Sequence, residues 1–143
     1  MAALSADPTI SVIVPARNEA GTLGATLRPL QSWRERGAEV LVVDGDSTDA
    51  TRDEAAPLAD RVLDAPPGRA RQMNAGAELA RGRILLFLHA DTLLPPEGDR
   101  ALRRALAGSG RRWGHFDVRL SGSDRRLLLR LVQRLMNRRS RWT

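Results

Sequence analysis

The chain has 143 residues, which suits a single domain, and 42% of them are apolar, enough for one hydrophobic core. It contains no cysteine, so disulfides, thiolate metal sites and cysteine nucleophiles are excluded. No apolar run is long enough to cross a bilayer, and the first nine residues lack the basic and apolar regions of a signal peptide. We therefore expect a cytoplasmic protein.

Positive charge is concentrated in the last third of the chain. All 23 basic residues are arginine. Residues 1–98 carry 10 arginines and 14 acidic residues, whereas residues 99–143 carry 13 arginines and 3 acidic residues. This asymmetry favours an anionic ligand, or a partner that faces the basic end.

Apolar runs that predict strands alternate with amphipathic segments that predict helices. The predicted strands are residues 10–14, 40–43, 61–63 and 84–88, and Pro15 is expected to end the first of them. The predicted helices cover residues 20–36 with a kink at Pro29, a segment capped by Ser47 or Thr48, residues 69–80, and residues 95–107. A further strand over residues 113–120 is weakly indicated.

The alternation of strands and helices predicts an α/β fold with a mostly parallel sheet flanked by helices. The strands read as continuous apolar runs, as expected where helices cover both faces of the sheet. Ligands of such sheets bind beyond the carboxyl ends of the strands. Polar clusters at residues 15–19, 44–49 and 89–92 follow three of these strands, so they form one candidate site.

The cluster at residues 44–49 has two interpretations. Asp44 at a strand end could accept hydrogen bonds from a ribose hydroxyl or a base N–H, or the cluster could simply be a turn that leads into a helix cap. A calcium loop of the EF-hand type is excluded, because Asp49 occupies the position that needs glycine and Ala55 the position that needs glutamate.

Two further groups of residues could bind a phosphorylated ligand. His89 and Asp91 alternate after a strand, so together they could hold Mg²⁺ or Mn²⁺ against phosphates, although an isolated histidine is often structural. Arg69 and Arg71 follow a Pro-Pro-Gly loop at a helix start, where backbone N–H groups attract anions. The alternative for this helix start is an ordinary solvated surface.

Several common enzyme motifs are absent from the sequence. There is no G-x-G-x-x-G motif after the first strand, and the lack of lysine excludes a Walker P-loop. The chain also lacks a G-x-S-x-G nucleophile motif and an H-E-x-x-H zinc motif. With two histidines and no cysteine, a zinc site is disfavoured.

The three strand-end motifs together resemble the family 2 glycosyltransferases. They read SVIVPARNE at residues 11–19, VLVVDGDSTDAT at 40–51 and RILLFLHADT at 83–92. The sequence is most similar to a bacterial subgroup that has H-A-D where most relatives have D-x-D. The resemblance covers about residues 8–142 and implies a GT-A fold, which is Rossmann-related. It also implies one domain, with a nucleotide-sugar-binding core at residues 8–110 and a basic segment at 111–143.

The resemblance implies a role for individual residues. Those expected at the nucleotide sugar are Pro15, Arg17, Asn18, Glu19, Asp44, Asp46, Arg71 and His89. Asp44 would contact the base, and Asp91, with His89, would bind a divalent cation, Mn²⁺ or Mg²⁺, that bridges the donor diphosphate. The donor would be a UDP- or GDP-sugar, and the acceptor is not indicated.

In this family an acceptor-binding half supplies the general base, and we expect that base beyond Thr143. The alternative is a nucleotide- or partner-binding module without catalysis. A sugar nucleotidyltransferase is disfavoured, because it would need a glycine-rich basic loop after the first strand, where residues 15–19 stand.

The basic segment 123–141 predicts an amphipathic helix. Its apolar stripe contains Leu128, Leu131, Val132, Leu135 and Met136, with arginines largely opposite. Such a helix could contact the inner membrane face, or it could pack on the domain core with a solvated arginine face. Nucleic acid is not expected as a partner, because aromatic residues are not interleaved with the arginines. An uncovered sheet edge would favour self-association.

Overall fold

The computed structural model describes residues 10–107, 109–110, 112–117, 134 and 137. The chain forms two compact units, Met1–Arg104 and Ala105–Thr143. In chain order the elements are β1 (Ile10–Ala16), α1 (Leu23–Leu27), η1 (Arg28–Leu30), α2 (Gln31–Glu35), β2 (Glu39–Asp44), α3 (Thr51–Ala55), β3 (Arg61–Asp64), α4 (Arg69–Leu79), β4 (Ile84–Phe87) and α5 (Gly98–Leu106).

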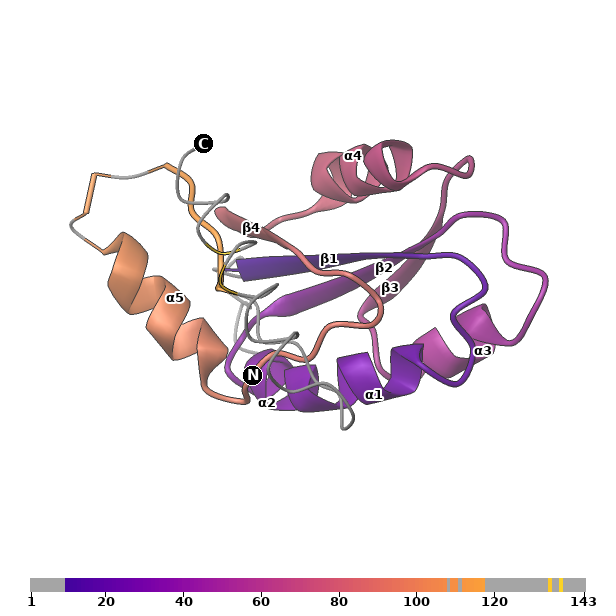
Figure 1. Cartoon of the computed structure of the whole chain (residues 1–143), viewed down its shortest axis with the longest axis horizontal. Helices are drawn as coiled ribbons and strands as arrows, with labels where there is room; N and C mark the ends of the chain where they lie inside the picture. The colour runs from indigo at the N-terminus through magenta and orange to yellow at the C-terminus, as the bar shows by residue number, and fades with distance from the viewer. Residues whose placement is uncertain (1–9, 108, 111, 118–133, 135–136, 138–143) are drawn as a thin grey trace, which may run out of the picture. The chain divides into compact units, whose positions relative to one another are not determined.

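The four strands form one parallel sheet in the order β3-β2-β1-β4. Helices α1, α2 and α3 cover one face of the sheet and α4 covers the other (Figure 1). Every residue of the central strands β1 and β2 is buried. The predicted α/β fold with a parallel sheet flanked by helices is therefore confirmed.

Alternate residues of β1 point into two hydrophobic clusters. Ile10, Val12 and Val14 pack in the larger cluster, with Leu23, Leu27, Leu30 and Trp33 of the helices below. Ile13 packs with Leu41, Val43 and the alanines of α4 in the smaller cluster. Gly76 lets α4 approach the sheet closely, since a Cβ there would lie 2.5 Å from Ile13 Cγ2.

Two prolines act differently from each other. Pro29 lies in η1, which divides the predicted helix 20–36 into α1 and α2. This break agrees with the kink expected at Pro29. Pro15 does not end β1, and that prediction is wrong. The parallel pairing continues to Ala16 opposite Asp44, because the φ angle that proline fixes is compatible with the end of an extended strand.

Strand β4 is only half covered. Leu85 is 41% exposed and Phe87 is 44% exposed, on the same face as α4. The prediction that both faces of every strand are buried is wrong here, because β4 is an edge strand and α4 packs on β1 and β2.

The second unit is described at few positions. Residues 113–117 form no strand, so the prediction of a strand from residue 113 is wrong over this part, and residues 118–120 lie outside the described residues. Of the segment 123–141, Arg134 and Asn137 are described, and both are helical. Among the described residues no helix is both long and apolar enough to span a membrane.

A buried ion pair anchors the start of α5. The Asp99 side chain is 1% exposed, and its two oxygens accept hydrogen bonds from Nε of Arg36 at 2.8 Å and Nη2 at 2.7 Å. Beside it, Trp33 Nε1 donates to the Pro95 carbonyl at 3.2 Å. The hydrogen bonds from Arg36 lower the pKa of the Asp99 carboxyl.

This ion pair makes stability depend on pH. Because the pKa of Asp99 is lowered on folding, its contribution is present at neutral pH and is lost as the pH falls below about 4 and through the lowered pKa of the folded state. We expect Asp99→Asn to lower the free energy of unfolding by about 2 kcal/mol at pH 7, measured by urea denaturation.

The difference between Asp99→Asn and the wild type should shrink at pH 3. Glu97→Gln is the matched control, since Glu97 pairs with Arg100 on the surface and both side chains are 61% exposed. Equal destabilisation by Asp99→Asn at both pH values would contradict a role for its charge.

Candidate functional site at the carboxyl ends of the strands

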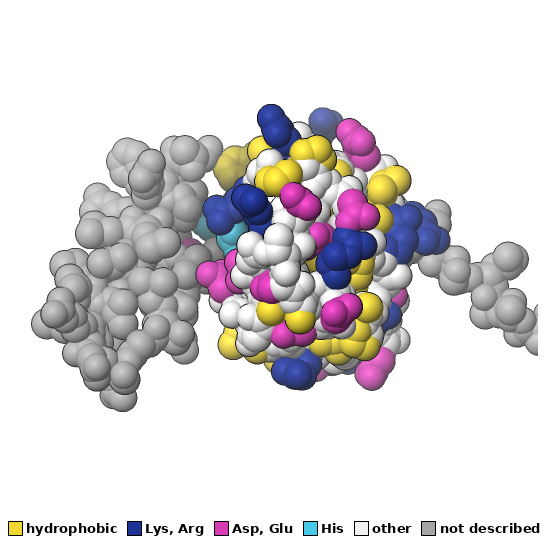
Figure 2. All heavy atoms as spheres, turned by 90° about the vertical axis from the view of Figure 1, so that its right-hand side faces the viewer, with side chains coloured by type: hydrophobic (Ala, Val, Ile, Leu, Met, Phe, Trp, Pro, Cys, Tyr) yellow, Lys and Arg dark blue, Asp and Glu magenta, His cyan; other side chains and the backbone are white. Residues whose placement is uncertain are grey.

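The carboxyl ends of the four parallel strands lie along one edge of the sheet. From β1 the chain proceeds to β2 and β3 on one side, and β4 pairs on the other side. The strand order therefore reverses at β1, which is where open α/β sheets bind ligands. Figure 2 views this edge and shows acidic and arginine side chains interspersed, with a histidine among them.

Asp44 ends β2 as a buried carboxylate with one unpaired oxygen. The residue is 2% exposed, its Oδ2 accepts the Ser47 N–H at 3.0 Å, and Arg52 Nη1 lies 3.7 Å from the same oxygen. Oδ1 is buried and has no hydrogen-bond partner within the described part of the chain. A buried acceptor without a donor is costly, so this oxygen is suited to a ligand that brings an N–H or O–H group.

An open pocket of about 420 Å³ lies at Asp44. Its lining residues come from the loop after β2, from α3 and from the end of β3: Asp44, Asp46, Ser47, Arg52, Asp64, Ala65 and Pro66. The pocket thus combines carboxylates with one guanidinium group at the predicted edge of the sheet.

The loops after β1 and β2 are joined by hydrogen bonds. The Asn18 N–H donates to Ser47 Oγ at 2.9 Å, and the Thr48 N–H donates to Asn18 Oδ1 at 2.8 Å. The Glu19 N–H donates to Thr51 Oγ1 at 2.8 Å. Two of the three predicted clusters therefore form one connected unit, in which the Asn18 side chain holds the neighbouring loop.

Helix α3 begins differently from the prediction. Its N-cap is Ala50, so the cap predicted at Ser47 or Thr48 is wrong: these side chains bond to the loop after β1 instead. The side chain of Asp49 satisfies a backbone N–H at the start of the helix instead, because its Oδ1 accepts the Thr51 N–H at 3.0 Å. The Thr51 hydroxyl also donates to Asp49, and this bond lowers the pKa of that carboxyl.

Asn18 and Asp46 both have left-handed backbone conformations, with φ of 52° and 64°. Among the described residues they are the non-glycine positions with positive φ, and both lie in these loops. Such conformations persist where the surrounding contacts enforce them, and they are concentrated in binding and active sites.

A buried amide ties helix α4 to the sheet edge. Gln72 is 4% exposed, and its Nε2 donates to the carbonyls of Ala16 at 2.9 Å and Val43 at 2.8 Å. Its Oε1 accepts the Gly68 N–H at 3.3 Å. Gly45 has to remain without a side chain, since a Cβ there would lie 2.8 Å from the Gln72 amide.

The third cluster, residues 89–92, follows β4, and residues 89–91 alternate between exposed and buried. Ala90 is buried, whereas His89 and Asp91 on either side are exposed. The Thr26 hydroxyl of α1 donates to the Ala90 carbonyl at 2.5 Å and so holds this loop. Among the described residues no group of three or more histidine, cysteine or acidic side chains forms a metal site. His89 and Asp91 offer one imidazole and one carboxylate.

The remaining predicted residues differ in exposure. Arg17 and Arg71 are exposed, and within the described part of the chain neither side chain has a hydrogen bond or an ion pair. Glu19 is half-buried and Pro15 is buried in β1. The arginines are thus available to an anion, whereas Pro15 shapes the strand end.

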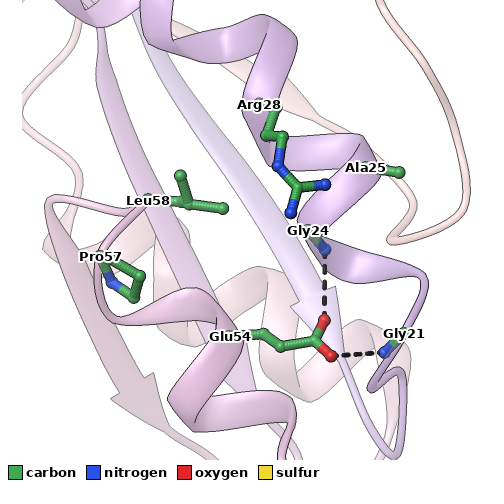
Figure 3. Close-up of a pocket in the computed structure, with 7 residues that line it drawn as sticks. All are labelled: Gly21, Gly24, Ala25, Arg28, Glu54, Pro57 and Leu58. Carbon is green, nitrogen blue, oxygen red and sulfur yellow. Dashed lines mark hydrogen bonds between the residues drawn. The ribbon is translucent and has the colours of Figure 1, made fainter.

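A second open pocket, of about 400 Å³, lies between α1 and α3 (Figure 3). Glu54 occupies it, and its carboxylate accepts the Gly21 N–H at 2.6 Å and the Gly24 N–H at 3.4 Å. Because Glu54 already bonds within the pocket and no strand end contributes to the lining, we assign it no ligand.

Three residues of the edge were not identified from the sequence as functional candidates. Gln72, Thr26 and Arg52 position the strand ends, the loop after β4 and Asp44, respectively. Gln72 and Gly76 are four residues apart, so they lie on the same, buried face of α4. This spacing is the signal in the sequence that could have identified Gln72 as buried.

The sequence matches the family model described as glycosyl transferase family 2 over residues 11–140. A PGL/p-HBAD biosynthesis glycosyltransferase of Mycobacterium tuberculosis is 41% identical over 96 residues. That match covers 62% of this chain and 38% of the relative. The chain therefore spans well under half the length of this curated relative.

Two solved structures share the fold. A mannosyltransferase from Pyrobaculum calidifontis in complex with GDP-Man and Mn²⁺ has a TM-score of 0.65 at 27% identity, covering 73% of this chain and 34% of that one. Glucosyl-3-phosphoglycerate synthase from M. tuberculosis, in complex with Mn²⁺, UDP and glucosyl-3-phosphoglycerate, has a TM-score of 0.63 at 26% identity. The match covers 72% of this chain and 41% of that one.

Replacing Gln72 tests the anchoring of the strand ends. We expect Gln72→Met to lower the free energy of unfolding by about 2 kcal/mol in urea denaturation, because the two buried hydrogen bonds from Gln72 to the Ala16 and Val43 carbonyls are lost. Glu78→Met is the control on the exposed side of α4 and should change stability by less than about 0.5 kcal/mol. Equal effects of the two variants would mean that the Gln72 bonds contribute nothing.

Proposed function

The chain belongs to glycosyl transferase family 2, and from this premise we propose that the carboxyl edge of its sheet binds the nucleotide sugar donor of a glycosyl transfer. The observation that carries the proposal is the unpaired, buried Oδ1 of Asp44, a residue that lines an open pocket. A nucleobase N–H satisfies this oxygen, whereas a helix-cap role would leave it unpaired.

The neighbouring loops then serve the rest of the nucleotide. Asp46 lines the same pocket and can accept a ribose hydroxyl. Arg17 and Glu19, with Pro15 and the backbone of Asn18, lie at the end of β1 and in the loop after it, and they are proposed to contact the rest of the donor. The Asn18 side chain acts indirectly, because its oxygen already accepts the Thr48 N–H.

Arginine side chains at this edge favour a diphosphate. Arg71 is exposed in the first turn of α4 and is proposed to contact the donor phosphates, and the unpaired Arg17 can do the same. Guanidinium groups bind phosphate oxygens in a bidentate manner, so they would orient the diphosphate along the strand ends.

A divalent cation fits the residues after β4. His89 and Asp91 are exposed on either side of the buried Ala90, and a nitrogen and oxygen ligand pair suits Mn²⁺, with Mg²⁺ as the harder alternative. Both solved relatives described above carry Mn²⁺. When bound, such an ion would offset negative charge on the departing diphosphate. We propose Asp91 and His89 as its protein ligands.

The acceptor side is part of the same proposal. Transfer to a hydroxyl with inversion needs a base that removes the hydroxyl proton. We assign this base, and the acceptor contacts, to residues beyond Thr143. The 143-residue chain is then expected to bind the donor on its own.

Metal-dependent nucleotide binding tests the proposal. We expect isothermal titration to show binding of UDP or GDP that is at least tenfold tighter with Mn²⁺ than without it. Asp91→Ala should reduce the affinity in Mn²⁺ to that of the metal-free wild type, because one cation ligand is lost. Glu97→Gln, which removes an exposed carboxylate of the same region, is the control and should bind as the wild type does.

Circular dichroism establishes that each titrated variant is folded. If the folded wild type binds neither nucleotide, the proposed donor site is wrong. If Asp91→Ala retains the full effect of Mn²⁺, the proposed metal ligand is wrong.

A further inference from the structure

Thr26 is a buried polar residue in an otherwise apolar stripe that begins in helix α1. It is 1% exposed, and Leu23, Leu27 and Leu30, at helical spacing around it, are fully buried. A buried hydroxyl needs a hydrogen-bond partner, and a helical threonine can donate to the carbonyl four residues before it. Thr26 donates instead to the Ala90 carbonyl at 2.5 Å, 64 residues further along the chain. Its hydroxyl therefore holds the segment that follows β4.

The Ala90 carbonyl lies between the two proposed metal ligands. His89 and Asp91 are exposed, whereas the Ala90 side chain is buried in the larger hydrophobic cluster. Within the described part of the chain no backbone N–H donates to this carbonyl, so the Thr26 hydroxyl is its donor. The carbonyl belongs to the planar peptide group that joins Ala90 to Asp91. The bond from Thr26 thus fixes the direction in which the Asp91 side chain leaves the backbone.

Helix α1 is itself tied to the other two clusters of the sheet edge. The Ala20 N–H, at the end of the loop after β1, donates to Asp49 Oδ2 at 3.1 Å. Glu54 of α3 accepts two further N–H groups at the start of α1 (Figure 3). Through Thr26 the segment after β4 is therefore linked to the loops after β1 and β2, which are already joined to each other.

The two ends of the segment after β4 have anchors of their own. At its start the Leu88 N–H donates to the Ile13 carbonyl at 3.0 Å. At its far end the Ser32 hydroxyl donates to the Pro96 carbonyl at 3.3 Å. Loss of the Thr26 hydroxyl would release the middle of the segment, where the proposed metal ligands lie, while both ends stay attached.

We propose that Thr26 is a positioning residue for the divalent cation. It fixes the peptide group between His89 and Asp91 relative to the loops that contact the nucleotide. Because Thr26 is buried in α1, it acts through the backbone of Ala90 and not by contact with the ion or the donor. This inference rests on the proposed function, since it takes His89 and Asp91 as the metal ligands, and it adds a residue outside the strand-end clusters on which the effect of the metal depends.

The experiment separates the effect of the metal from nucleotide binding itself. The Kd values of UDP and GDP are measured by isothermal titration with and without Mn²⁺, and the two values are compared for the nucleotide that the wild type binds more tightly. Thr26→Val removes the hydroxyl and keeps the branched shape. It should reduce the gain in affinity from Mn²⁺ at least fivefold and leave the metal-free affinity within twofold of the wild type. Thr26→Ala should behave in the same way.

Two variants serve as controls. Thr26→Ser keeps the hydroxyl and should keep the gain from Mn²⁺ within twofold of the wild type. Ser32→Ala removes a hydroxyl that donates to the far end of the same segment, and it should leave both affinities unchanged. Circular dichroism establishes that each variant is folded.

The Asp91 amide nitrogen gives a readout without metal, because it shares a peptide bond with the Ala90 carbonyl. Its NMR chemical shift in the metal-free chain should change in Thr26→Val. In Thr26→Ser and Ser32→Ala it should stay near the wild-type value.

Three results would overturn this inference and leave the proposed function intact. In the first, folded Thr26→Val and Thr26→Ala keep the full gain from Mn²⁺. In the second, they weaken binding equally with and without the metal, which would indicate general damage to the site. In the third, Thr26→Ser loses as much of the gain as Thr26→Val, so that packing and not the hydroxyl is responsible. A folded wild type that binds neither nucleotide, or that gains nothing from Mn²⁺, overturns the proposed function and this inference with it.

Discussion

The buried amide of Gln72 determines where the ends of the two central strands lie. Gln72 Nε2 donates to the Ala16 carbonyl at the end of β1, which also accepts the Gly45 N–H at 2.9 Å, and to the Val43 carbonyl in β2. Because Gln72 belongs to α4, the same bonds fix the start of that helix against the edge. The turn at Gly45 then follows directly, since any side chain there would collide with this amide.

Asp44 is held in the frame that these bonds define. The Ser47 N–H and Arg52 satisfy one carboxylate oxygen, and the other stays buried and unpaired. Asn18 and Asp46, in the loops after β1 and β2, have left-handed backbone conformations. An unpaired acceptor and two strained residues all reduce stability, and a ligand N–H would remove the largest of these costs. We interpret the edge as a preorganised base-recognition site.

The sequence predicted what depends on local pattern. The apolar runs predicted strands β1 and β2, and the polar residues after them predicted which edge of the sheet carries the candidate site. Both predictions were possible because strands and the loops that follow them differ in composition. It could not show that β4 is an edge strand with Leu85 and Phe87 exposed, since this depends on strand order. Nor could it show the Arg52 contacts, which join residues from β2, α3 and β3.

The most direct test of this account replaces Asp44 by asparagine and measures nucleotide affinity and stability on the same protein. Asparagine can still accept the Ser47 N–H, but it can present a donor to the base in place of Oδ1. We predict that Asp44→Asn weakens the binding of UDP or GDP in Mn²⁺ at least tenfold, while the urea midpoint is unchanged or higher. Unchanged affinity together with a lower midpoint would contradict the account and show that Asp44 is a structural turn residue.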